Sequence, residues 1–175
     1  LFMTALDRLD DIKFWVEGGE YSPRELFAVG GTGVEEAHFQ VWFASELRRR
    51  SRQHYSVARE EEVGRQKKPD IRLHNPDCGD RPVGIEIKIA EKWTYGELRK
   101  ALETQLVGQY LTDTHANHGI LLLCSFGDER KAWRPPGKGN LSFVRVLDEL
   151  RTVAKDLLQT RPDLERLEVV GMDFH

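Results

Sequence analysis

The sequence predicts an α/β fold in which helices cover both faces of a mixed β-sheet. Segments with helical and with strand-like patterns alternate along the chain. Residues 83 to 90 alternate β-branched residues with Gly84, Glu86 and Lys88, which is the period of a strand. Residues 119 to 126 are nearly all apolar, as expected for a strand in the middle of a sheet that is covered on both sides.

The first 30 residues carry an amphipathic stretch that includes Leu9, Ile12 and Trp15, followed by Gly18-Gly19 and Ser22-Pro23. This pattern predicts a short helix and then a linker, or the end of an upstream domain. We therefore expect the main domain to span residues 31–175. The chain begins with Leu1 rather than Met, which indicates a domain cut from a longer polypeptide.

Helix starts in the main domain are indicated by capping residues. Thr32 with Glu35 three residues later predicts a helix that runs to about Arg50, and Ser142 predicts one that runs to about Gln159. The other elements follow from apolar periodicity and from turn residues between them. They are strands at 55–60, 70–73, 83–90, 119–126 and 167–174, and a long helix at 94–111.

Length and composition fit one globular domain, because 39% of the 175 residues are hydrophobic and 31% are charged. No apolar run reaches the roughly 20 residues needed to span a bilayer, and no secretory signal is visible at the start. Cys78 lies in a turn-rich loop and Cys124 in an apolar run, a placement that favours reduced thiols. We expect a cytoplasmic protein without a membrane partner.

The formal net charge of -3 argues against a protein that coats nucleic acid non-specifically, but basic residues are concentrated between positions 48 and 68. The candidates for contacts with a nucleic-acid backbone are Arg48, Arg49, Arg52, Lys67 and Lys68. A second basic segment, residues 130–138, has Trp133 at its centre. That ring either stacks on a base or folds back onto the protein, and we favour the second. Solvated helix ends and loops are the alternative for both segments.

Glu86 and Lys88 stand on one side of their predicted strand, and Asp70, directly after Pro69, begins the neighbouring one. Two carboxylates that lie close together repel each other, and a divalent cation between them removes that cost. An oxygen-rich site of this kind suits Mg²⁺ or Mn²⁺ and can support phosphodiester cleavage. The alternative is an exposed charged face of the sheet.

Pro69-Asp70 and Glu86-Ile87-Lys88, between a helix with acidic residues and a long helix with Gln105, resemble the motif of the PD-(D/E)XK nuclease superfamily. The resemblance covers roughly residues 34 to 126 and implies a restriction-endonuclease-like core. The stretch from Gln105 to Leu111, followed by residues 118–121, looks like a branch often fused to larger bacterial proteins, several of them in antiviral defence systems. It implies a Mg²⁺-dependent nuclease for which we expect DNA as the substrate, with upstream domains as partners and self-association as an option.

The resemblance also implies roles for the motif residues. Asp70 and Glu86 would bind the metal, and the carbonyl of Ile87 would complete its shell. Lys88 would orient or deprotonate the attacking water, or stabilise charge on the phosphate. We favour the electrostatic role, because nearby carboxylates raise the pKa of an amine.

The family places a glutamate on the first helix and a glutamine on the helix after the motif strand. Glu36 fits the first position better than Glu35, because it lies nearer the apolar side; acids favoured by the helix dipole are the alternative. Gln105 fits the second position, with an ordinary surface residue as the alternative. Tyr110 follows Gln105 by five residues, not four, which is about 140° around an α-helix, so we expect Tyr110 outside the site.

Two other classes of protein fit parts of this pattern. The same fold without catalysis would bind nucleic acid or a protein partner, and a metal-dependent phosphohydrolase would act on small nucleotides. His115, His118 and Cys124 lack the spacing of a zinc site.

Overall fold

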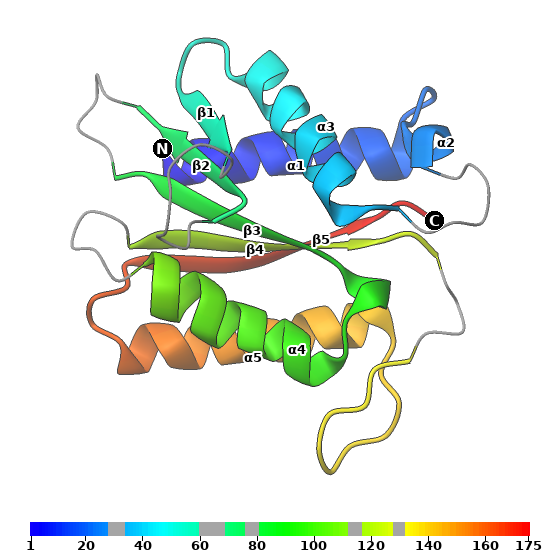
Figure 1. The fold of residues 1–175 in the computed structure, drawn as a ribbon, viewed down its shortest axis with the longest axis vertical. Coiled ribbons are helices and arrows are strands. Elements are labelled where there is room, and N and C mark those ends of the chain that lie inside the picture. The colour runs from blue at the N-terminus through cyan, green and yellow to red at the C-terminus, as the bar shows by residue number, and fades with distance from the viewer. Residues whose placement is uncertain (28–33, 60–68, 76–80, 112–116, 128–131) are drawn as a thin grey trace.

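The computed structural model describes residues 1–27, 34–59, 69–75, 81–111, 117–127 and 132–175. These residues form one five-stranded sheet with the strand order β1-β2-β3-β4-β5 (Figure 1). The strands are β1 (Ser56–Arg59), β2 (Ile71–His74), β3 (Val83–Ile89), β4 (His118–Ser125) and β5 (Arg166–Asp173). β1, β2 and β3 pair antiparallel, whereas β3, β4 and β5 pair parallel. The predicted mixed α/β class is confirmed.

The described helices form two layers, one on each face of the sheet (Figure 1). The layer above the sheet in the figure consists of α1 (Phe2–Gly18), α2 (Arg24–Phe27) and α3 (Glu36–Arg50). The layer below consists of α4 (Tyr95–Lys100), the π-helix η3 (Ala101–Tyr110) and α5 (Phe143–Thr160). A short 3₁₀ turn, η2 (Ala90–Lys92), leads from β3 into the lower layer. Parallel neighbours need a crossover between them, and the lower helices supply it.

β3 separates two apolar cores because its side chains alternate between the two faces. Ile85, Ile87 and Ile89 pack with α1 and α3 in the upper core. Ala90, at the end of the strand, belongs to the lower core with α4, η3 and α5. The side chains of Gly84, Glu86 and Lys88 therefore point toward the lower layer.

The N-terminal helix α1 belongs to the upper core. Its buried residues recur at helical spacing, and they are Phe2, Ala5, Leu9, Ile12 and Val16. They pack with α3 and the sheet, and Lys13 of α1 donates a hydrogen bond of 2.5 Å to the Gly171 carbonyl of β5. The segment expected to be a linker or the end of an upstream domain thus supplies a helix to the core of the sheet.

Side-chain caps begin two of the described helices, α4 and α5. Ser142 accepts a hydrogen bond from the Arg145 N–H, as expected. α4 begins with a capping box that the sequence reading missed, formed by Thr94 and Glu97. α3 begins at Glu36, with Glu35 at its N-cap and no side-chain hydrogen bond there. Thr32, the expected cap, lies outside the described residues.

Two expectations from composition can be followed in the fold. Within the described residues, no helix combines the length and the apolar character that a membrane crossing requires. Cys124 is a free thiol that is fully buried in β4, and burial raises its pKa. It therefore serves as a small apolar core residue, whereas Cys78 lies outside the described residues.

Candidate active site

The candidate site lies where β2 begins and β3 ends. Ile71 is opposite Ile85 in the antiparallel ladder, so Asp70, one residue before β2, comes next to Glu86. The Asp70 carboxylate accepts a hydrogen bond of 2.7 Å from the Ile87 N–H. This bond ties the loop before β2 to β3 and places Asp70 at the edge of the strand that carries Glu86 and Lys88.

The ammonium group of Lys88 lies between two carboxylates. Its Nζ atom is 2.8 Å from Glu86 Oε1 and 3.4 Å from Glu36 Oε1. Glu86 and Lys88 are only 2% and 5% exposed. The interpretation of this pair as an exposed charged face is therefore wrong, because both side chains are buried.

Glu36 reaches the cluster from the first turn of α3. Besides Lys88, its carboxylate accepts hydrogen bonds from the Ile89 N–H at 3.2 Å and from Trp93 Nε1 at 3.1 Å. Glu35 instead points outward, with an exposed side chain 3.7 Å from the Lys92 ammonium. The structure thus brings Glu36 to Lys88 and leaves Glu35 at the surface.

Trp93 is the residue of this cluster that the sequence reading missed. Its indole N–H donates to Glu36, and the Lys88 ammonium lies 5.1 Å from the centre of its ring. Such a cation–π contact adds to the stabilisation of a buried ammonium. The turn η2 reverses the chain after β3 and returns Trp93 to Lys88. No periodic pattern in the sequence signals a contact made through a turn.

Burial and neighbouring charges shift the acid–base properties of the cluster. Burial, followed by the negative charge of Glu86, raises the pKa of Asp70 to about 7, although the Ile87 N–H and Lys88 oppose the shift. Burial disfavours the charged form of Lys88, but Glu86, Glu36 and Asp70 together outweigh it and raise the pKa of Lys88. Lys88 therefore remains an ammonium at neutral pH, which suits charge stabilisation better than proton abstraction.

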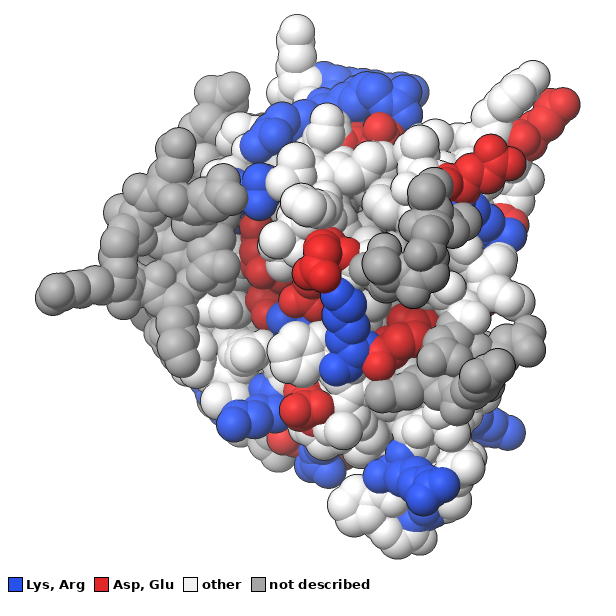
Figure 2. All heavy atoms as spheres, turned by 45° about the vertical axis from the view of Figure 1, so that its right-hand side comes forward, with Lys and Arg blue, Asp and Glu red and all other residues white. Residues whose placement is uncertain are grey.

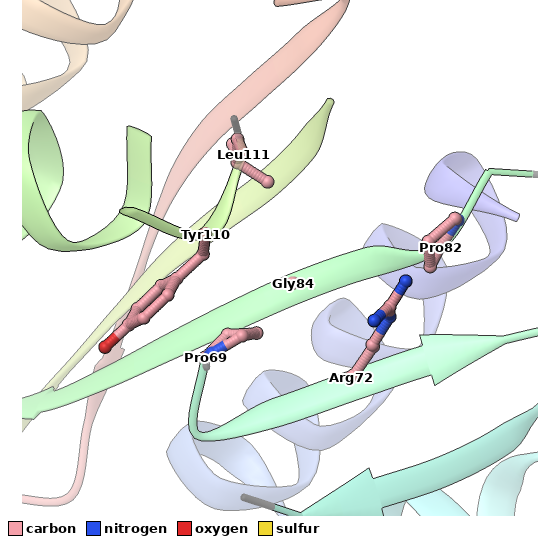
Figure 3. Close-up of a pocket in the computed structure, with 6 residues that line it drawn as sticks. All are labelled: Pro69, Arg72, Pro82, Gly84, Tyr110 and Leu111. Atoms are coloured by element: carbon pink, nitrogen blue, oxygen red, sulfur yellow. The ribbon is translucent and has the colours of Figure 1, made fainter. Parts of the chain in front are cut away.

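The helix that carries Gln105 differs from the expected one. η3 is a π-helix, and the Leu111 N–H donates to the Leu106 carbonyl, five residues back, at 3.1 Å. In this geometry the residue at i+5 lies nearly above residue i. Tyr110 therefore lies closer to the side of Gln105 than α-helical spacing predicts, although its ring packs against the lower core, as expected for a residue outside the site. Figure 3 shows the Tyr110 ring beside β3, with its hydroxyl directed away from Pro82.

Gln105 itself is half-buried on η3. Its Oε1 atom is buried and accepts no hydrogen bond from the part of the chain that the structure describes. Within the described part of the chain, no hydrogen bond connects Gln105 to Asp70, Glu86 or Lys88. Gln105 is thus the one motif residue whose link to the cluster is its position on the helix rather than a contact.

Three of the basic residues proposed as backbone contacts are described, and they lie away from this cluster. α3 begins at Glu36 in the site and ends at Arg50, about 20 Å further along the helix axis. The candidates at this far end are Arg48, Arg49 and Arg52, whereas Lys67 and Lys68 lie outside the described residues. Figure 2 shows blue atoms along the upper edge of the molecule, and red and blue atoms close together near the middle of the face.

Contacts within the protein already engage part of this basic group. Arg48 donates a hydrogen bond of 3.3 Å to the Val57 carbonyl. Arg49 forms an ion pair of 2.8 Å with Glu46 and lies over the Trp15 ring. These contacts are exposed, so the arginines can also contact a polyanion. Because the arginines are far from Glu36, only an extended substrate would reach both them and the candidate site.

Trp133, in the second basic segment, is folded back onto the protein. The residue is 3% exposed, and its indole N–H donates to the carbonyls of Ala90 and Trp93 at 3.3 and 3.1 Å. It therefore does not present its ring to a nucleic-acid base. Its bonds instead fix the turn η2 that positions Trp93.

Asp70 and Glu86 occupy neighbouring backbone positions at the β2–β3 edge, and their oxygen atoms are donors that suit a divalent cation. Within the described part of the chain, no three His, Cys, Asp or Glu side chains are gathered as a metal site. Burial, followed by the negative charge of Glu86, disfavours the ionised form of Asp70, and a cation beside the two carboxylates would offset that cost. Because the N–H and C=O of one strand residue point to the same edge, the Ile87 carbonyl faces the edge where Asp70 lies. The two carboxylates and this carbonyl, completed by water, fit Mg²⁺ or Mn²⁺.

Comparison with known proteins found no relative of this chain. No family model matches the chain, and neither a curated protein nor a solved structure matches it. The class of the site therefore rests on its own geometry and on the motif.

Proposed function

We propose that this chain is a metal-dependent nuclease domain with a restriction-endonuclease-like core, which hydrolyses phosphodiester bonds in DNA. The order α3, β1, β2, β3, α4 with η3, β4 supports this assignment, because it places Asp70 and Glu86-Ile87-Lys88 on neighbouring strands. The resemblance to the PD-(D/E)XK superfamily further supports a role as the effector domain of a larger bacterial protein in antiviral defence.

The observation that carries the proposal is the buried Asp70, Glu86 and Lys88 cluster. A buried charged cluster costs free energy, since each ion loses several kcal/mol of solvation. A fold gains more stability from apolar residues at such positions. Two carboxylates beside an ammonium at a strand end are, however, the groups that phosphodiester hydrolysis uses.

Each residue has a defined task in this mechanism. Asp70, Glu86 and the Ile87 carbonyl would hold the metal ion, which supplies the charge that activates a water molecule and polarises the phosphate. Lys88, held as an ammonium by Glu86 and Glu36, would neutralise negative charge on the phosphate as the bond to the leaving oxygen breaks. Glu36 would keep Lys88 in position through its contact of 3.4 Å.

The test is cleavage of a supercoiled plasmid by the purified protein with Mg²⁺, with Mn²⁺ or with EDTA. We expect nicking or linearisation that needs the metal, and a loss of at least about a hundredfold in rate for Asp70→Asn, Glu86→Gln and Lys88→Met. Matched controls are Lys155→Met and Asp156→Asn, whose side chains are exposed on α5; both should cleave at the parental rate. Cleavage by Asp70→Asn at the parental rate would reject this site.

A catalytically inactive module that binds nucleic acid or a protein is the second candidate. The observation that favours it is the position of Lys88, whose ammonium lies between Glu36 and Glu86 and already neutralises part of their charge. In that case the folded protein would bind labelled DNA equally well in EDTA and in Mg²⁺, and no concentration of either metal would produce cleavage.

A further inference from the structure

Arg72, an arginine without a partner among the residues that the structure describes, lies beside the candidate site. Arg72 follows Asp70 by two residues, or about 7 Å of extended chain, and its side chain lies on the face of β2 opposite the buried Ile71 and Leu73. No hydrogen bond or ion pair joins its guanidinium to another residue that the structure describes. Arg49 and Arg50, at the far end of α3, differ in this respect because both pair with Glu46.

Among the described residues, the side chains of β1 that lie beside Arg72 are small and exposed. In the register of β1 and β2, Ala58 is opposite Arg72 and Ser56 is opposite His74, and all four residues are exposed. The helices of the lower layer lie against β3, β4 and β5. Within the described residues, the lower face of β1 and β2 is therefore a shelf with Arg72 at its centre and Asp70 at its edge.

A small pocket joins this shelf to η3. Gly84 is the ladder partner of Arg72, and the pocket at this point has a volume of about 30 Å³. Figure 3 shows Arg72 and the ring of Tyr110 on the two sides of Gly84. A Cβ atom at Gly84 would lie 3.2 Å from Pro69 Cγ, so a side chain at this position would close the gap.

The size and lining of this gap indicate what it can receive. A space of this volume holds about one water molecule, so neither a nucleobase nor a nucleotide enters it. A guanidinium on one side and an aromatic ring on the other suit a phosphate and its neighbouring sugar, which would pass over the glycine. The distance between Asp70 and Arg72 is comparable to the spacing of neighbouring phosphates along one nucleic-acid strand.

We propose that the shelf of β1 and β2 binds the DNA backbone beside the cleavage site, with Arg72 on the phosphate next to the one that is cut. This inference rests on the proposed nuclease function and assigns one substrate contact to it. The contact is to the backbone, so it adds affinity without sequence preference. It also directs the substrate across β2. The arginines at the end of α3 lie too far from the site to do this.

The experiment measures binding of a fluorescein-labelled DNA duplex by anisotropy in EDTA, at several KCl concentrations. Arg72→Gln should weaken binding about three- to tenfold on every DNA sequence and lower the salt slope by about one. Arg72→Lys should keep the slope, because it keeps the charge. The matched control is Arg145→Gln, an exposed arginine on α5, which should bind as the parent does. With Mg²⁺, Arg72→Gln should raise KM and leave kcat near the parental value.

If Arg72→Gln binds DNA with the parental affinity and salt slope, the proposal that the shelf binds DNA is wrong. Cleavage by the parent would in that case still support the nuclease proposal. Binding that depends on Arg72, without cleavage in any metal, would support the shelf and reject the nuclease. A folded parent that neither binds nor cleaves DNA would overturn both. Ala58→Glu is an independent check, because a carboxylate opposite Arg72 should pair with it and weaken binding.

Discussion

The two faces of β3 bury opposite kinds of side chain to the same degree. Ile85, Ile87 and Ile89 are at most 3% exposed on one face, and Glu86 and Lys88 are 2% and 5% exposed on the other. Burial of the isoleucines stabilises the fold, at about 25 cal/mol per Å² of apolar surface. Burial of the charged pair costs solvation free energy that the pairing only partly returns. The difference teaches that one face of this strand stabilises the fold, whereas the other carries buried charges for which we propose a role in catalysis.

The largest expected effect comes from removal of one charge from the polar face. Lys88→Met leaves the carboxylates of Glu36, Glu86 and Asp70 without their ammonium group, so the free energy of unfolding should fall by about 3–5 kcal/mol at pH 8. The double variant Glu86→Leu with Lys88→Met removes both charges and should regain parental stability within about 1 kcal/mol. Urea unfolding followed by tryptophan fluorescence measures both, and the double variant should remain unable to cleave DNA.

The apolar face of β3 supplies the matched control for this pair. Ile87→Ala should lower the free energy of unfolding by about 2–5 kcal/mol, through lost contacts and a cavity. Val144→Ala, at a residue that is 63% exposed on α5, should lower it by less than about 0.5 kcal/mol. A double variant on the polar face that is as unstable as Lys88→Met would contradict the comparison, because the charges would then contribute to stability.

A dependence of stability on pH is the next effect in size. The pKa of Asp70 is raised to about 7, so between its usual value and pH 7 the folded protein binds a proton that the unfolded chain releases. Stability without metal should therefore fall as the pH rises through this window, by a few kcal/mol. Asp70→Asn should remove this contribution, so the variant should match the parent at pH 4 and exceed it at pH 8. The measurement is urea unfolding at each pH in EDTA.

The same titration separates a metal site from a structural carboxylate. A divalent cation favours the ionised form of Asp70, so Mg²⁺ should stabilise the parent more at pH 8 than at pH 5 and leave Asp70→Asn unchanged. Equal stabilisation of parent and variant at pH 8 would show that the ion binds elsewhere.

The strand positions could be predicted from the sequence because periodicity reports directly which residues face a core. Alternation in residues 83–90 and the apolar run after Gly119 identified β3 and β4. The neighbouring places of Asp70 and Glu86 followed from strand order, since an antiparallel turn brings the start of β2 to the end of β3.

Three features could not be read from the pattern, each for a physical reason. The pattern of an amphipathic helix shows which of its faces is buried, but not which core covers that face. The sequence therefore left open whether α1 belongs to this domain or to an upstream one. The π-helix places Tyr110 near Gln105 through a change of backbone hydrogen bonding that no residue spacing signals. Trp93 meets Glu36 through the turn η2, and long-range contacts of this kind depend on the whole fold.

The smallest expected effect tests how the apolar frame supports the polar face. Trp93→Phe keeps an aromatic ring beside Lys88 but removes the N–H that donates to Glu36, so stability should fall by about 1 kcal/mol. The backbone carbonyl that accepts from Trp133 remains, so η2 should keep its conformation.

Besides Lys88, Glu36 has two N–H donors, and this variant removes one of them. The value of kcat should fall several-fold while KM changes little, because positioning rather than DNA binding is affected. Trp42→Phe is the control, since its indole N–H donates to no residue that the structure describes. A Trp93→Phe variant with parental kcat would show that the Ile89 N–H alone is sufficient to orient Glu36, and that Trp93 contributes packing to the site rather than position.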